Sequence, residues 1–216
     1  MLKVTGDGKK LALDPRCIDP SLSDERGSKL SFCADNVYEE WKSSADIKGT
    51  QLVFCDLSTP KKPYSEYEYG KDFDAYNDLK HKLIERGIPE NEIAFIHDAN
   101  TDRAKQDLFD KINAGAVRVL IGSTEKCGAG TNVQKRLVAI HHLDAPYRPR
   151  DLIQRNGRGI RQGNMNKGIR IYTYATERTF DSYSYQILEN KQRFISQVEK
   201  GDMTVREADD IDEATL

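Results

Sequence analysis

The sequence lacks the patterns that would place a protein in a membrane, outside the cell or around a metal ion. No stretch of 18 apolar residues occurs and no segment reads as a secretion signal, so neither membrane spanning nor export is expected. The four cysteines form no Cys-x-x-Cys pair, which argues against a disulfide framework or a zinc site and suits a reducing compartment. We therefore expect a cytoplasmic protein with no membrane partner and no metal site.

A phosphate-binding loop of the usual kind is also absent. No Gly-x-x-x-x-Gly-Lys-Ser/Thr pattern occurs, and the glycines and lysines of residues 6–10 have the wrong spacing. Asp212, Glu213 and Ala214 have the letters of a helicase acidic box, but no apolar strand precedes them. The chain is therefore not expected to hold a nucleoside triphosphate and magnesium by itself.

What the sequence does contain is the composition of an ordinary globular protein with an uneven charge. Charged residues make up 31% of the 216 residues and apolar residues 38%, and the net charge is −2. Residues 148–170 carry seven basic side chains and one acid, whereas residues 207–213 carry five acids and no base. The basic segment could face a polyanion, and the acidic tail is expected to be disordered.

Apolar runs and helical periodicity alternate along the chain. Such alternation predicts an α/β fold with a mostly parallel sheet and helices on both faces, in one domain with a long C-terminal helix. Strands are expected at residues 51–57, 92–97, 117–122, 137–143 and 169–175. Helices are expected at residues 28–44, 73–86, 102–113, 149–160 and 180–198. His141 and His142 lie in one of the apolar strands and are expected to be structural residues.

Ligands of parallel sheets bind beyond the carboxyl ends of the strands, so the loops after Asp56, His97, Gly122 and Leu143 are of interest. Two of these loops carry unusual residues. The loop of residues 123–134 has glycines that let a backbone approach a ligand, with short polar side chains and a lysine around them. These residues are Ser123, Thr124, Lys126, Gly128, Gly130, Thr131 and Asn132. Asp144 ends the next strand, and Pro149 suits the first position of the helix that follows.

That helix carries the most informative pattern of the chain. Gln154, Arg158 and Arg161 are spaced four and three apart, so a helix would present them on one face. Two neighbouring guanidiniums repel each other, and a pair held together in this way usually indicates a binding site for an anion. Their forked donors suit phosphate oxygens. The alternative reading of this segment is a solvated basic helix face.

Residues 119–163 resemble the second RecA-like lobe of superfamily-two helicases and translocases, particularly the Swi/Snf type. The loop of residues 123–132 resembles helicase motif V, and Gln154, Gly157, Arg158 and Arg161 match motif VI. Weaker similarities extend the match to residues 28–198, through segments that resemble motif IV at 51–56, the region before motif V at 98–113 and a brace helix at 179–198. The nearest resemblance is to the helicase part of large helicase–adenine-methylase proteins of phages and other mobile elements.

The resemblance implies a RecA-like three-layer domain and a division of the chain into four parts. These are a lead segment at 1–27, the helicase lobe at 28–178, a brace helix at 179–200 and the acidic tail at 201–216. It also implies that the chain is the second motor lobe of an ATP-dependent DNA helicase or translocase. ATP would lie between this lobe and a first RecA-like lobe of the same longer protein, which would hold the magnesium. DNA and, in the nearest group, a fused adenine methylase are the other expected partners.

Residue roles follow from the same resemblance. Arg161 is expected to be the arginine finger, with Arg158 assisting and Gln154 positioning the arginines or the attacking water. The residues expected to contact the nucleotide are Gly128, Gly130, Asn132, Asp144 and Gly157. The residues expected to contact nucleic acid are Ser123, Thr124, Lys126 and Arg148. Without the first lobe the chain is expected to be inactive in ATP hydrolysis.

Some positions depart from the Swi/Snf pattern, so the resemblance does not determine how the chain contacts DNA. Glu125 stands where an arginine is common, Arg148 where an asparagine is common, and Ile160 where a histidine is common. Two other functions remain as alternatives. One is a non-catalytic nucleic-acid-binding or docking module with the same fold, and the other is a free-standing doubly wound enzyme whose phosphate loop contains Gly157, Gly159 and Gly163. The spacing of these glycines is not the dinucleotide-binding pattern.

Overall fold

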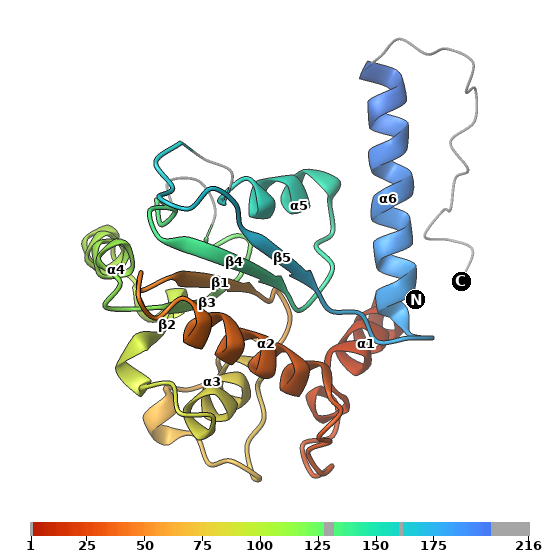
Figure 1. Cartoon of the computed structure of the whole chain (residues 1–216). Coiled ribbons are helices and arrows are strands. Elements are labelled where there is room, and N and C mark those ends of the chain that lie inside the picture. Colours follow the sequence, from red (N-terminus) through yellow and green to blue (C-terminus); the bar gives the residue numbers. More distant parts are fainter. Residues whose placement is uncertain (1, 128–131, 160–161, 200–216) are drawn as a thin grey trace.

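The structure is a computed structural model that describes residues 2–127, 132–159 and 162–199, with the side chains of 2, 198 and 199 left out (Figure 1). At its centre is a sheet of five parallel strands in the order β2–β3–β1–β4–β5. The strands are β1 Thr50–Phe54, β2 Ile93–Phe95, β3 Val119–Gly122, β4 Leu137–His142 and β5 Arg170–Thr173. The predicted mostly parallel α/β fold is therefore confirmed.

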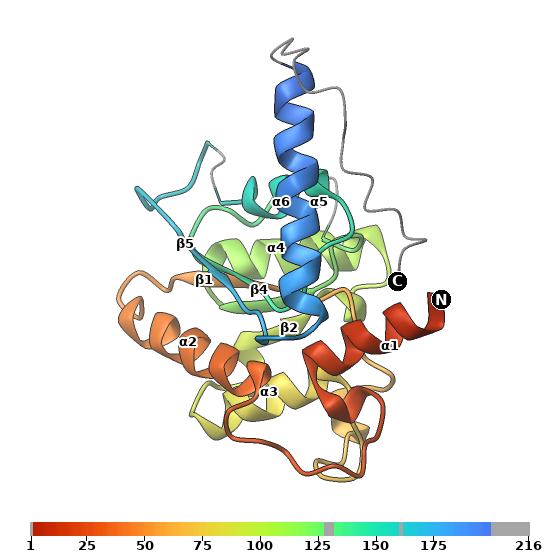
Figure 2. The same cartoon turned by 90° about the vertical axis from the view of Figure 1, so that its right-hand side faces the viewer.

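Helices cover both faces of the sheet, as expected for a three-layer domain. Helices α2 and α3 lie on one face and α4 and α5 on the other, while α6 stands beside the sheet and extends past it (Figures 1 and 2). Their bounds are α1 Leu2–Leu13, α2 Lys29–Ser43, α3 Ala75–Glu85, α4 Asp102–Ala114, α5 Pro149–Asn156 and α6 Phe180–Glu199. Short 3₁₀ turns lie at Pro15–Cys17, Tyr64–Glu66, Glu90–Glu92 and Ile96–Asp98.

The central strand β1 explains why the apolar runs are continuous rather than alternating. All five of its residues are buried, because helices cover the sheet on both sides. Val53 points into the core beneath α2 and α3, whereas Leu52 and Phe54 point into the core beneath α4. The two cores alternate along the strand with the period of two that a pleated backbone imposes.

Several helix ends follow the local signals in the sequence. Ser28 caps α2, Asp74 caps α3 and Thr101 caps α4, each by accepting the backbone N–H three residues further on. Gly115 ends α4 in the left-handed conformation with φ 76°, which a glycine adopts without strain. These boundaries agree with the sequence-based helices to within two residues.

Two helices differ from expectation. Residues 2–13 form α1, although Gly6 and Gly8 lower helix propensity and no helix was predicted there. Helix α5 ends at Asn156 rather than near residue 160, since the backbone tightens into turns at Arg158 and Gly159. The predicted acidic tail, residues 201–216, lies outside the described residues. Within the described residues, no helix is long and apolar enough to cross a membrane.

Helix α1 is stabilised by packing against the first turn of α6, far away in the sequence (Figure 2). A Cβ atom added to Gly8 would overlap the ring of Phe180 in α6, whereas one added to Gly6 would meet nothing within 4 Å. The glycine at position 8 thus permits a close approach between the two helices. Tertiary contact offsets the poor helix propensity of the segment.

We predict that Gly8→Ala and Gly6→Ala have opposite effects on stability. Gly8→Ala should lower the free energy of unfolding by about 1–3 kcal/mol, because the added methyl group overlaps the Phe180 ring. Gly6→Ala, its control in the same helix, should raise it by about 0.5–1 kcal/mol through helix propensity. Urea unfolding of both variants measures the two effects. Equal effects would contradict the packing between α1 and α6.

Strand β4 carries two buried histidines, in agreement with the structural role expected for them. His141 lies between the hydroxyl of Tyr174 and the side chain of Gln51, each 2.9 Å from one of its ring nitrogens. Burial lowers the pKa of His141 to about 3 and that of His142 to about 4, with further lowering of the latter by the Arg155 charge. Both rings are therefore neutral in the folded protein near pH 7.

These histidines should make the folded state sensitive to mild acid. The unfolded chain binds protons near pH 6.5, whereas the folded histidines remain neutral to about pH 4, so the free energy of unfolding falls as pH decreases between those values. His141 alone should account for a loss of about 2 kcal/mol between pH 7 and pH 5. In urea unfolding at both pH values, His141→Gln should lose correspondingly less stability than the wild type. An unchanged pH dependence in the variant would contradict this assignment.

Candidate functional site

A cleft of about 510 Å³ lies at the carboxyl edge of the sheet, where three of the four predicted ligand-binding loops meet, and the loop after Leu143 does not line it. Its walls come from the segments that follow β1, β2 and β3 and from helix α5. The residues that line it are Asp56, Thr59, His97, Ser123, Thr124, Glu125, Lys126, Asp151 and Gln154. Three residues predicted to contact nucleic acid, Ser123, Thr124 and Lys126, are thus brought together with Gln154, which was predicted to be catalytic. They reach one cleft because parallel strands end at the same edge.

Beneath this cleft, Arg155 of α5 joins the ends of three strands. Its side chain is fully buried, and the guanidinium lies 5.2 Å from the centre of the Phe54 ring. Its Nη2 donates to Asp56 at 2.7 Å and to Asp144 at 3.1 Å. Its Nη1 donates to the carbonyl oxygen of Asp144 at 2.9 Å, and its Nε to the hydroxyl of Thr124 at 2.7 Å. Asp56, Thr124 and Asp144 follow β1, β3 and β4, so one side chain fixes three loops.

The electrostatics of this cluster follow from one cation between two carboxylates. Burial opposes the charge of Arg155, but Asp144 and Asp56 outweigh it and raise the pKa of the guanidinium. Burial raises the pKa of Asp144, the nearby charge of Asp56 raises it further, and Arg155 works against both. With its members ionised the cluster carries a net charge of −1. Removing the arginine would leave two neighbouring carboxylates uncompensated.

Asp144, expected to contact the nucleotide, has its carboxylate committed within the protein. It is 3% exposed, and one of its oxygens accepts the backbone N–H groups of Asp56 and Leu57 at 2.5 and 2.8 Å. Its other oxygen accepts from Arg155. The carboxylate therefore ties the end of β4 to the end of β1. Its role toward a nucleotide stays a prediction.

Thr124 is held firmly at the floor of the cleft. Its backbone N–H donates to one oxygen of Asp56 at 2.6 Å, and its hydroxyl donates to the other oxygen at 2.8 Å. The same hydroxyl accepts from Arg155 Nε. Beside it, Ser123 is 8% exposed and its hydroxyl oxygen accepts the backbone N–H of Lys126 at 3.3 Å. The turn after β3 is thus ordered by polar contacts as far as Cys127.

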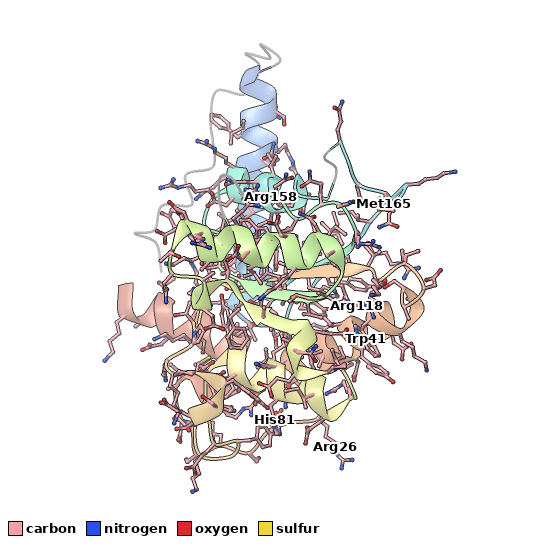
Figure 3. The ribbon with its side chains drawn as sticks, turned by 90° about the vertical axis from the view of Figure 1, so that its left-hand side faces the viewer. Arg26, Trp41, His81, Arg118, Arg158 and Met165 are labelled. Carbon is pink, nitrogen blue, oxygen red and sulfur yellow. The ribbon has the colours of Figure 1, made fainter. Side chains whose placement is uncertain are left out.

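The expectation that Gln154 and Arg158 share a helix face is wrong. Gln154 is in α5 and faces the cleft, but α5 ends two residues before Arg158, and Gly157 is its C-cap. Arg158 lies in the following turn near α5 (Figure 3) and is 2% exposed. Burial raises the pKa of the Cys127 thiol to about 12, and the charge of Arg158 works against that rise, so the guanidinium lies near the loop after β3.

The remaining predicted residues are not in the cleft or lie outside the described residues. Arg148 is the exposed N-cap residue of α5, and Asn132 is exposed, with its carbonyl oxygen accepting from the side chain of Asn113 at 2.7 Å. Gly157 ends α5. Gly128, Gly130 and Arg161 lie outside the described residues, and so does Thr131. Among the residues that are described, no cluster of three potential metal ligands occurs.

The sequence-based selection missed Arg155 and Asp56. A signal for both was present, because Arg155 stands next to Gln154 within the motif, and the strands ending at residues 56 and 144 each finish on an aspartate. Acids at the ends of neighbouring parallel strands meet at one edge, where a buried arginine can pair with them.

The protein-family model of the helicase conserved C-terminal domain matches residues 49–163, just over half of the chain. The chain belongs to this family of helicase C-terminal domains. The predicted resemblance to the second lobe of superfamily-two helicases is thereby confirmed. The matched residues include the four elements that border the cleft, which are β1, β2, β3 and α5.

Two known proteins are similar to this helicase lobe. Defense against restriction protein B of Escherichia phage P1 is 32% identical over 100 residues, which are 45% of this chain and 4% of the phage protein. The crystal structure of the C-terminal part of the Fun30 ATPase domain has the same fold, with a TM-score of 0.53 and 17% identity. That match covers 77% of this chain and 47% of the other, so the lobe spans only part of either relative.

We predict that Arg155→Ala destabilises the helicase lobe by about 3–5 kcal/mol, because it leaves the carboxylates of Asp56 and Asp144 unpaired. Arg150→Ala is the matched control, since Arg150 is an exposed residue of the same helix and should change stability by less than about 0.5 kcal/mol. Chemical denaturation of the two variants measures the difference. A loss below about 1 kcal/mol for Arg155→Ala would show that the cluster does not hold the loops together.

Proposed function

We propose that this lobe is the second motor lobe of an ATP-dependent DNA helicase or translocase, completing an ATP site that a first RecA-like lobe builds in part. The observation that carries the proposal is the cleft at the carboxyl edge, which brings Gln154 of the arginine motif together with Ser123, Thr124 and Lys126. The chain is a helicase C-terminal domain. In the proposed motor, Gln154 would act on the nucleotide and the turn after β3 would contact DNA, and both lie at the same edge of the sheet. The similarity to a phage protein supports an origin in a phage or mobile element.

On the nucleotide side, the proposal assigns charge and position to three residues. Arg161 is the arginine that reaches the γ-phosphate, and an arginine of this kind accelerates phosphoryl transfer by about 10³–10⁵. Arg158 is buried in the turn after α5 and adds positive charge to this part of the lobe without reaching across to the nucleotide itself. Gln154 faces the cleft and orients the attacking water or the arginine. ATP supplies the scissile phosphate, and its magnesium ligands belong to the first lobe.

On the nucleic-acid side, the proposal assigns backbone contacts to the turn after β3. Hydroxyl groups, backbone N–H groups and lysine side chains are common donors to phosphate oxygens and read no sequence. Ser123 and Lys126 bring a hydroxyl and a lysine side chain to the cleft, and Thr124 brings a hydroxyl and a backbone N–H that Asp56 accepts in this structure. Arg148, exposed at the start of α5, supplies a further positive charge. Contacts of this kind suit a motor that tracks along DNA irrespective of sequence.

The burial of the arginines weighs against a docking module that binds phosphates through them directly. Arg155 is 1% exposed and its charge is committed to two carboxylates, and Arg158 is 2% exposed. Both would have to leave the core before contacting a phosphate on the surface. In the motor, by contrast, positive charge acts in a pocket enclosed by two lobes. Electrostatic interactions are stronger in such a buried pocket than at an open surface.

ATP hydrolysis tests this proposal. We expect almost no DNA-stimulated hydrolysis by this lobe alone, turnover when it is joined to its upstream first lobe, and a fall of at least about 10³ on Arg161→Ala. Gln154→Ala should reduce the catalytic rate constant with little change in the binding of DNA. Arg150→Ala is the control for loss of one basic side chain and should retain the wild-type rate.

Two outcomes would refute parts of the proposal. If the joined protein with Arg161→Ala hydrolyses ATP at the full rate, the assignment of the arginine is wrong. If the joined protein never hydrolyses ATP while the lobe alone binds duplex DNA with a steep salt dependence, the docking module is the better explanation.

A further inference from the structure

Three donors converge on the carboxylate of Asp56 at the floor of the cleft. They are the backbone N–H of Thr124, the hydroxyl of Thr124 and Nη2 of Arg155, at 2.6, 2.8 and 2.7 Å. A backbone N–H, a hydroxyl and a guanidinium are also the groups that proteins use to bind the oxygens of a phosphate. The side chain of Asp56 is 34% exposed, so this internal anion lies at the boundary between the cleft and the core.

Both donors of Thr124 are committed to Asp56. A threonine has one backbone N–H and one hydroxyl proton, and Asp56 accepts both of them. The hydroxyl oxygen in turn accepts from Arg155. A phosphate of nucleic acid can therefore receive a hydrogen bond from Thr124 only if Asp56 gives up at least one of its own.

Electrostatics make it costly for both anions to stay. Asp56 and Asp144 already share the single positive charge of Arg155. A phosphate beside Thr124 would place a third negative charge within a few ångströms, and like charges at such distances in a partly buried site repel strongly. Replacing Asp56 by the phosphate as the acceptor from Thr124 costs less free energy than binding the phosphate beside an unmoved Asp56. The carboxylate of Asp56 can keep its contact with Arg155 while it releases Thr124.

We propose that Asp56 is a positioning residue that occupies the phosphate-binding donors of Thr124 in the absence of nucleic acid and is displaced from them by a backbone phosphate. The inference rests on the proposed function, in which Thr124 contacts nucleic acid. Displacement breaks the link between Asp56 and Thr124, both of which Arg155 contacts, and Arg155 is the neighbour of Gln154 in α5. Binding of nucleic acid is thereby linked to the placement of a residue on the nucleotide side.

Asp56→Asn tests the exchange, because the amide keeps nearly the same shape and one acceptor oxygen but lacks the negative charge. We expect the lobe with Asp56→Asn to bind a labelled DNA duplex about tenfold more tightly than the wild type in fluorescence anisotropy at a fixed salt concentration. In the protein joined to its first lobe, the rate of ATP hydrolysis without DNA should rise toward the stimulated rate. The ratio of stimulated to unstimulated rates should therefore fall severalfold.

Asp151→Asn is the matched control. Asp151 also lines the cleft, so its replacement removes the same charge from the same space, but no hydrogen bond joins it to Thr124 among the described contacts. The stimulation ratio should remain at the wild-type value in this variant. If Asp56→Asn merely damaged the structure, both DNA binding and ATP hydrolysis would fall. The displacement mechanism predicts instead that DNA binding improves and that the ratio of stimulated to unstimulated hydrolysis falls.

The outcomes separate failure of this inference from failure of the proposed function. If wild-type protein shows DNA-stimulated hydrolysis but Asp56→Asn leaves both affinity and ratio unchanged, or Asp151→Asn reproduces its effects, the role of Asp56 is refuted and the motor function stands. If wild-type joined protein binds no DNA and hydrolyses no ATP, the proposed function is refuted, and the role of Asp56 falls with it.

Discussion

The contact on which the edge of this domain depends is the buried pairing of one guanidinium with two carboxylates. Arg155 reaches Asp56 after β1 and Asp144 after β4, and it also holds Thr124 after β3. A parallel sheet places these strand ends together but does not fix the loops that leave them. The planar fork of arginine has five donors and can reach acceptors on all three loops, whereas a lysine has three donors on one nitrogen. The shape of the cleft thus follows from one side chain.

Burial explains why that pairing is demanding. Taking the charges of Arg155 and Asp144 out of water costs free energy that only close, complete hydrogen bonding returns. Asp144 meets this condition with two backbone N–H groups as well as the guanidinium. Asp56 meets it while remaining partly exposed, and it is therefore the member of the cluster that can respond to a ligand. The same hydrogen-bond network thus joins the buried side chains of Arg155 and Asp144 to the partly exposed side chain of Asp56.

The sequence was sufficient for the layers of the fold and insufficient for the details of the site. Continuous apolar runs such as residues 51–55 are explained by strands covered on both faces, and caps such as Ser28 and Gly115 mark helix ends, so the order of elements could be predicted. Helix α1 could not, because its glycines argue against a helix and contacts with distant residues such as Phe180 compensate. The end of α5 was predicted too late, because the spacing of Gln154, Arg158 and Arg161 favoured a longer helix although Gly157 and Gly159 are signals for a helix end.

The early end of α5 changes how the motif has to be understood. On one continuous helix, Gln154 and Arg158 would project together toward solvent. With the helix ending at Asn156, Gln154 stays at the cleft, whereas Arg158 lies buried in the following turn. The side chain between them, Arg155, points to the strand ends. Consecutive parts of one motif thus contact the cleft, the loop after β1 and the loop after β3, so a shift in any of these segments has to be accommodated by α5. A short helix held in this way is suited to transmit a change at one wall of the cleft to the other.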